Sequence, residues 1–312
     1  MVQQTPDVLV RFQNVQKSYD GETLVVKDLN LDIHHGEFLS LLGPSGSGKT
    51  TCLMMLAGFE HPTAGQITLD GASLNDVPPH KRNIGMVFQN YALFPHMTVF
   101  KNLEYPLKVR KIPADQRKQK IQEALAMVQM EAFANRHPAQ LSGGQQQREA
   151  LARPLVFKPK LVLMDEPLGA LDKQLREHMQ IELKSLHRSL GITFVYVTHD
   201  QSEALTMSDR VAVFDQGIIQ QVSTVDTLYE TPENRFVAGF VGDCNHFPAV
   251  ITASDGDACT AHLASGDIIT ANNIQNLAVN DKCIIAIRPE RLSVVDNASL
   301  PNVITTKVLD RV

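Results

Sequence analysis

Three short apolar runs in the middle of the chain have the length of buried strands. They are "EFLSLLG" at 37–43, "KLVLMDE" at 160–166 and "ITFVYVTHD" at 192–200, and they end in glycine, acids or histidine. Helical segments lie between them, such as "LDKQLREHMQIELKSLHRSL" before the third run. Strands that alternate with helices predict an α/β domain with a mostly parallel sheet.

The two ends of the chain follow a different pattern. Apolar and polar residues alternate over the first 35 or so positions around a turn at "DGE", which predicts antiparallel strands. After about Phe236, the runs "FPAVI", "ACTAHLA", "DIITA" and "CIIAIRPERLSVV" are separated by Asp, Gly and Asn turns. We therefore expect one α/β domain over 1–235 and a small β domain over 236–312.

A helical pattern from about Asn102 to Arg136 interrupts the strands of the first domain. Within it, Ile121, Leu125 and Val128 fall on one helix face. We expect a helical subdomain over about 98–155.

The composition excludes several classes of protein. The 312 residues carry a net charge of −5, whereas a general nucleic-acid binder normally shows a basic excess. The four cysteines are scattered without a CxxC pair, which argues against a metal cluster or a disulfide framework. No signal-peptide layout and no apolar run of about 18 residues is present. We expect a soluble cytosolic chain that binds no nucleic acid.

"GPSGSGKT" at 43–50 matches the phosphate-binding pattern G-x-x-x-x-G-K-[ST], between a predicted strand and an apolar helix. The backbone amides of such a loop surround the β-phosphate, and the Lys49 ammonium lies between the β- and γ-phosphates. The Thr50 hydroxyl suits Mg²⁺. The sequence therefore predicts a nucleoside triphosphate site. Its candidate residues are Gly43, Pro44, Ser45, Gly46, Ser47, Gly48, Lys49, Thr50 and Thr51.

Three other strand ends supply candidate catalytic groups. Asp165 would hold Mg²⁺ and Glu166 would polarise the attacking water. His199, which taken alone is a strand-end histidine without chemistry, could reach a γ-phosphate. The side-chain amide of Gln89 could touch Mg²⁺ or the attacking water. The alternative interpretation is that Gln89 is a surface glutamine without a role in the site.

"LSGGQ" at 141–145 is a second candidate anion site. Ser142 and Gln145 form an S-x-x-Q capping box, and Gly143 and Gly144 leave the first amides of the helix uncovered.

The order P-loop, "VFQ", "LSGGQ", "LMDEP", "GALD", "VTHD" resembles the ATP-binding subunits of ABC transporters, over about Val8 to Phe236. The resemblance implies ATP and Mg²⁺ as ligands and two copies packed head to tail. Each "LSGGQ" helix would then cap the ATP held by the Lys49 loop of the other copy. It also implies that Tyr19 stacks on adenine and that Asp172 joins the two sites. Taken without the resemblance, Tyr19 is better explained as a plain strand tyrosine.

Two positions depart from the family pattern. Gly169 stands where many members have serine, so that a hydrogen bond is in doubt. Pro154 stands in the "LSGGQ" helix where alanine is commoner, and it removes a backbone hydrogen bond at a cost of ~3 kcal/mol. We expect that helix to kink or stop near Arg153.

Membrane helices, a long coiled coil and a second P-loop are all missing, which favours the importer group within the family. The resemblance then implies a chain on the cytoplasmic face of the inner membrane, bound peripherally to permease subunits and served indirectly by a substrate-binding protein. Phe94, Pro95 and His96 are candidates for the permease contact, and Phe94 could equally belong to the core of the helical subdomain. "DEPLGALDKQLREHMQIELKSLH" and "NRFVAGFVGDCNHFPAVI" are most similar to spermidine/putrescine importers.

The last domain resembles the OB-like regulatory module of these importers, with Arg288, Pro289 and Glu290 matching its Arg-Pro-Glu strand. The module is expected to be incomplete here. Three alternatives stay open: an importer ATPase for a sugar, ferric iron or sulfate, a soluble non-transport ABC ATPase, and an ATP-binding regulator without turnover. Loss of Glu166 or His199 would indicate the last of these, and both are present.

Overall fold

The computed structural model describes residues 7–294 and 302–304. The chain forms two compact units, Met1–Val225 and Asp226–Val312. The predicted domain boundary at residue 235 lies in the second unit, at the start of its helix α8.

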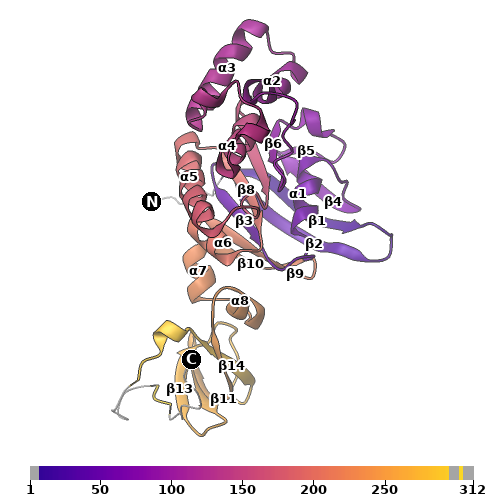
Figure 1. Cartoon of the computed structure of the whole chain (residues 1–312). Coiled ribbons are helices and arrows are strands. Elements are labelled where there is room, and N and C mark those ends of the chain that lie inside the picture. Colours follow the sequence, from indigo (N-terminus) through magenta and orange to yellow (C-terminus); the bar gives the residue numbers. More distant parts are fainter. Residues whose placement is uncertain (1–6, 295–301, 305–312) are drawn as a thin grey trace, which may run out of the picture. The chain divides into compact units, whose positions relative to one another are not determined.

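A six-stranded sheet forms the centre of the first unit (Figure 1). Its spatial order is β10 (Ile218–Thr224), β9 (Arg210–Asp215), β3 (Phe38–Leu42), β8 (Thr193–Thr198), β7 (Leu161–Asp165) and β6 (Ile84–Val87). Every neighbouring pair is parallel except β9 and β10. The predicted parallel sheet is therefore confirmed, and the three apolar runs are its adjacent strands β3, β8 and β7.

Both faces of this sheet are covered, and the side-chain alternation of the strands explains why. Leu161 and Leu163 of β7 point into one core, and Val162 and Met164 into another. A strand that is buried on both faces reads as a continuous apolar run rather than as an alternation. This is the pattern that the sequence shows at 160–166.

Helix α1 (Lys49–Ala57) and a four-stranded antiparallel sheet cover the first face of the central sheet. That second sheet has the order β2 (Leu24–His34), β1 (Val8–Ser18), β4 (Ala64–Leu69) and β5 (Ala72–Ser73). The antiparallel pairing of β1 with β2 confirms the prediction for the first 35 residues.

Three helices contribute to the core on the opposite face: α4 (Gly143–Leu155), α5 (Lys173–Leu190) and α6 (Gln201–Met207). Helices α2 (Val99–Val109) and α3 (Ala114–Met127) pack with α4 around a third core, in which Ile121, Leu125 and Val128 are buried. The predicted helical face is thus confirmed. The helical pattern is shorter than expected, since α3 ends at Met127 and one short 3-10 turn, Glu131–Phe133, follows before Arg136.

Helix α4 ends within two residues of Arg153, as the sequence predicts. It runs through Pro154 and ends at Leu155, so that the proline lies in its last turn. Pro154 is buried, and a Cβ built on Gly85 of β6 would lie only 2.7 Å from the Cβ of Pro154. The glycine lets strand and helix approach closely, and this packing holds the proline in the helix.

The second unit contains α7 (Val225–Glu230) from its second residue on, α8 (Arg235–Phe240) and a four-stranded sheet. The sheet has the order β13 (Ile268–Asn272), β12 (Ala258–Leu263), β11 (Asn245–Asp255) and β14 (Lys282–Ile287), all antiparallel. The small β domain is confirmed.

The Arg-Pro-Glu segment is not a strand. Strand β14 ends at Ile287, and Pro289–Arg291 is a 3-10 turn. Arg288 is buried, and its guanidinium donates to the carbonyls of Tyr229, Ala238, Gly242 and Asp243 at 3.0–3.2 Å. The arginine therefore joins α7 and α8 to the end of the β-sheet in the second unit.

Candidate functional site

The predicted phosphate loop connects β3 to α1 at the carboxyl edge of the central sheet. Helix α1 begins without a side-chain cap, and its N-cap residue Gly48 has a φ of 102°. Gly46 also has a positive φ of 78°, a conformation that residues with a Cβ rarely adopt. A Cβ on Gly43 would lie 2.3 Å from the carbonyl oxygen of Phe214. The loop thus presents uncovered amides at a helix N-terminus, which is the arrangement that binds phosphate.

Lys49 is the charged group of this loop. Its side chain is buried, and Nζ donates to the carbonyls of Gly43 and Pro44 at 2.8 Å and lies 3.3 Å from Oγ of Ser47. Burial lowers the pKa of Lys49, and the nearby carboxylates of Glu166 and Asp165 act in the opposite direction. The ammonium is therefore held inside the loop, where it can meet an anionic phosphate.

Thr50 and Asp165 form a pair of hard oxygen ligands. The Thr50 hydroxyl donates to Oδ1 of Asp165 at 3.0 Å, which joins the start of α1 to the end of β7. Burial raises the pKa of Asp165. A carboxylate and a hydroxyl of this kind suit Mg²⁺, which takes few protein ligands and completes its shell with water and substrate phosphates. The residues present therefore fit a magnesium ion.

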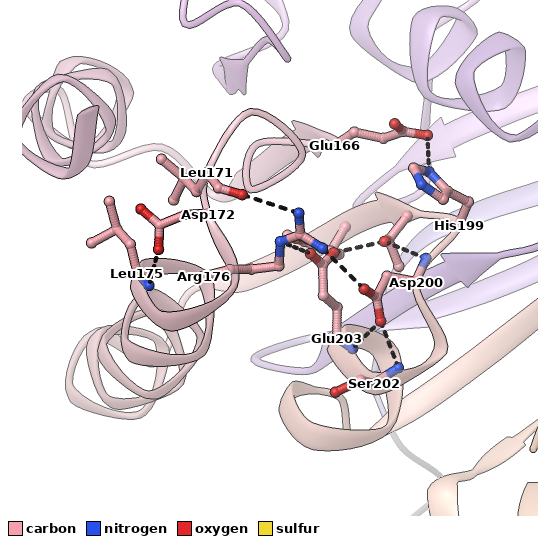
Figure 2. Close-up of polar contacts among 11 residues, drawn as sticks. Glu166, Leu171, Asp172, Leu175, Arg176, His199, Asp200, Ser202 and Glu203 are labelled. Carbon is pink, nitrogen blue, oxygen red and sulfur yellow. Dashed lines mark hydrogen bonds and ion pairs between the residues drawn. The ribbon is translucent and has the colours of Figure 1, made fainter.

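Glu166 and His199 face one another at the ends of β7 and β8 (Figure 2). Nδ1 of His199 lies 3.1 Å from Oε1 of Glu166. Glu166 has a φ of 44°, an uncommon backbone conformation for a non-glycine residue. Such strain clusters at functional sites, where the surrounding structure holds it in place. Here the Glu166 amide donates to the carbonyl of Val197 at 3.0 Å.

Gln89 follows the adjacent strand β6 and is exposed. Its Nε2 would lie 3.8 Å from a Cβ built on Gly169, an ordinary contact. The site therefore has room for a serine at position 169, although glycine occupies it in this chain.

The sheet order explains why these predicted residues meet. β3, β8, β7 and β6 are neighbours, and the P-loop, His199, Asp165 with Glu166, and Gln89 follow their carboxyl ends. Ligands of open α/β sheets bind at this edge. Tyr19 lies in the bend directly after β1, with 59% of its surface exposed, and Nζ of Lys17 lies 4.8 Å from the centre of its ring.

The "LSGGQ" segment forms the predicted helix start of α4. The Gln145 amide donates to the Ser142 hydroxyl at 3.4 Å, and the Ser142 amide donates to the Gln145 side chain at 3.0 Å. The capping box is confirmed. Gly143 is exposed, and over residues 7–294 no hydrogen bond or ion pair links this helix start to the P-loop of the same chain.

Asp172 is the N-cap of α5, and its carboxylate accepts from the Leu175 amide at 2.9 Å. This bond gives Asp172 a structural role as the cap of α5. Among the described residues, no hydrogen bond to its second carboxylate oxygen is found.

Two features of the site region were missed by sequence reasoning. One is the set of contacts around Arg176, which joins the start of α5 to the segment from Asp200 to Glu203. The other is Glu149 of α4, a fully buried carboxyl group whose oxygens have no hydrogen-bond partner among the residues that the structure describes. A single acid within a helical pattern gives no signal of its burial, because only the packing around α4 decides it.

Glu149 makes the stability of the first unit depend on pH. Burial raises the pKa of its carboxyl group from 4.5 to about 7, against a smaller opposite effect of the Arg153 charge. Between these two values, the folded chain keeps a proton that the unfolded chain has released. Stability is therefore greatest below the lower pKa and falls as the pH rises through the upper one.

Replacing Glu149 by Gln keeps the shape of the side chain and removes the titration. We expect the free energy of unfolding of the wild type to fall by about 2–3 kcal/mol more than that of Glu149→Gln between about pH 5 and pH 7.5. Urea unfolding at the two pH values measures this difference. Equal losses in both proteins would show that Glu149 ionises normally in the folded state.

Comparison with known proteins agrees with this geometry. The profile of the ABC transporter family matches residues 26–169. The spermidine/putrescine import ATP-binding protein PotA of Rubrobacter xylanophilus is 49% identical over 306 residues, which cover 97% of this chain and 80% of that protein. The PotA protein of Marinobacter nauticus is 56% identical over 249 residues, which cover 80% of this chain and 66% of that protein.

Solved structures show the same fold. CbiO1 of Clostridium perfringens, part of the ABC transporter complex CbiONQ, covers 71% of this chain and 90% of its own length, with a TM-score of 0.66 and 27% identity. The dimeric bacterial ABC transporter cassette MJ0796 covers 70% of this chain and 99% of its own length, with a TM-score of 0.61 and 37% identity. A further structure of MJ0796 is a post-hydrolysis state bound to ADP and phosphate.

Proposed function

Since this chain belongs to the ABC transporter family of ATP-binding proteins, we propose that it hydrolyses ATP to power the import of spermidine and putrescine. The observation that carries the ATPase part is the pairing of Glu166 with His199 at 3.1 Å, at the ends of β7 and β8 on the same sheet edge as the P-loop. The substrate is supported by the PotA relatives, whose similarity extends over 97% of the chain in one case.

The chain's own groups divide the chemistry between them. Lys49 and the loop amides hold the β- and γ-phosphates, and Glu166 orients and polarises the attacking water. His199, bonded to Glu166, lies where it can detect the γ-phosphate. Thr50 and Asp165 would hold Mg²⁺, with Gln89 nearby, and the ion would supply positive charge that offsets the charge of the phosphates.

A second copy of the chain completes each site in this proposal. The start of α4 at Ser142, Gly143, Gly144 and Gln145 is a capped helix terminus that the chain's own P-loop does not use. Two-fold symmetry would bring this helix terminus to the γ-phosphate of the ATP that the partner binds. Tyr19 would stack on the adenine. The dimeric MJ0796 cassette supports such an assembly.

We further propose that closure of this dimer drives the permease. No helix in the described part of the chain is long and apolar enough to cross a membrane. In this proposal the chain works peripherally on the cytoplasmic face of the inner membrane, docked on integral permease subunits that receive polyamine from a binding protein. Phe94, Pro95 and His96 belong to the proposed contact. Phe94 is half-buried, with its ring centre 4.8 Å from that of Tyr105.

Uptake of labelled putrescine and spermidine tests the substrate. In cells without another polyamine importer, changing Glu166 to Gln in the chromosomal copy should reduce polyamine uptake by about 10²-fold or more, because turnover stops. Sugar and iron uptake should not change. The matched control is Glu131→Gln, an exposed acid remote from the strand ends. Unchanged polyamine uptake with loss of another solute would overturn the polyamine assignment and leave the ATPase standing.

A further inference from the structure

Arg176 of α5 lies between two loops of the proposed site, one turn after Asp172 (Figure 2). One terminal nitrogen donates to the carbonyl of Leu171 at 3.1 Å, and the other donates to Oδ2 of Asp200 at 3.3 Å. Leu171 directly precedes Asp172, and Asp200 directly follows His199. One side chain therefore joins the neighbours of two residues that the nucleotide site uses.

A buried carboxylate holds Thr198, the residue that precedes His199. Glu203 of α6 is buried, and its Oε2 accepts from the hydroxyls of Tyr196 and Thr198, both at 2.7 Å. The Asp200 amide donates to the Thr198 hydroxyl at 2.9 Å. Nε of Arg176 lies 3.9 Å from Oε1 of Glu203, close enough for attraction between charges and too far for a hydrogen bond. The two neighbours of His199 in the chain, Thr198 and Asp200, are therefore both held by side-chain hydrogen bonds.

Asp200 also has a structural role that must be separated from this one. Its Oδ1 accepts from the amides of Ser202 and Glu203 at 2.8 and 3.2 Å, and so caps α6. Arg176 uses the other oxygen of the same carboxylate. The cap therefore remains when Arg176 is removed, whereas the link from α5 to the His199 loop is lost.

We propose that Arg176 is a positioning residue that ties the loop of His199 to the loop of Asp172. The placement of His199 relative to Glu166 then depends on the Asp172 loop, which the proposed dimer brings to the partner copy. Binding of the partner copy would thereby change the position of His199 through the guanidinium of Arg176. This inference rests on the proposed function. The planar guanidinium of arginine suits this role, because its separate nitrogens bond both loops at once. A lysine side chain carries only one nitrogen.

The test compares Arg176→Gln and Arg176→Lys in the full chain, by single-turnover ATP hydrolysis with enzyme in excess. We expect Arg176→Gln to lower the rate about tenfold, since small misplacements of catalytic groups are costly, and to leave the Kd for ATP within about twofold. Arg176→Lys should recover only part of the rate. The matched control is Lys184→Gln, because the Lys184 ammonium also joins α5 to α6, through the Thr206 carbonyl at the far end of α6.

A double-mutant cycle with His199→Ala separates positioning from stability. If Arg176 acts through His199, then Arg176→Gln should lower the rate by less than about twofold once His199 is gone. An additive tenfold loss would overturn the proposal, as would a normal rate in Arg176→Gln. A wild-type chain that fails to hydrolyse ATP would instead overturn the proposed function. A general loss of stability would appear equally in Lys184→Gln.

Discussion

Glu166→Gln is expected to lower the rate of ATP hydrolysis about 10²–10³-fold while ATP still binds, and to leave the chain as a stable dimer in ATP and Mg²⁺. The glutamine amide has nearly the shape of the carboxylate but cannot polarise a water molecule. Its oxygen can still meet Nδ1 of His199, which lies 3.1 Å from Oε1 in the wild type. The groups that hold phosphate and metal, Lys49, Thr50 and Asp165, are unchanged.

The trapped dimer follows from the position of the γ-phosphate in the proposed assembly. Hydrolysis removes the group that the α4 terminus of the partner contacts, and the copies then separate. Light scattering after size exclusion measures the mass with ATP and Mg²⁺, with ADP, and without nucleotide. Glu131→Gln should remain monomeric after turnover. A Glu166→Gln chain that binds ATP and stays monomeric would contradict the shared site.

Much of this fold could be predicted from the sequence because its signals are local. The strands β3, β7 and β8 are continuous apolar runs, since helices or a second sheet cover both of their faces. The P-loop lies between a strand and a helix, and its chemistry depends on backbone amides that contiguous residues supply. The capping box of Ser142 and Gln145 spans only four positions.

The features that sequence reasoning missed depend on residues far apart in the chain. Arg176, Asp200 and Glu203 come from two helices and a loop, and no spacing between them marks their contacts. The end of α4 near Arg153 was predicted, but the close approach of Gly85 to Pro154 depends on the distant strand β6. The segment after Ile287 leaves the sheet because Arg288 turns inward to four carbonyls, and its apolar neighbours had suggested a longer strand.

The two proposed roles of each copy, binding ATP through its P-loop and capping ATP through α4, can be separated by mutation. Gly143→Asp should abolish the capping role. Gly143 is exposed, and a Cβ there would lie 3.5 Å from Leu171, an ordinary contact. An acid in the first turn of a helix is itself favourable. The variant should therefore fold normally and yet repel the γ-phosphate of the partner. Gly143→Asn is the uncharged control of the same shape and should keep most of the activity.

Mixing Gly143→Asp with Glu166→Gln should restore hydrolysis that neither variant has alone. In a mixed dimer, the P-loop and Glu166 of the first variant meet the intact α4 terminus of the second, and this one site is complete. At equal amounts, random pairing makes half of the dimers mixed and one of their two sites works, which gives an initial rate of about a quarter of the wild-type rate. The rate then declines as pairs of Glu166→Gln chains become trapped. The proteins are combined without nucleotide, and phosphate release is followed after ATP is added. If each chain instead used its own α4 terminus, both sites in every dimer would be defective and mixing would restore nothing.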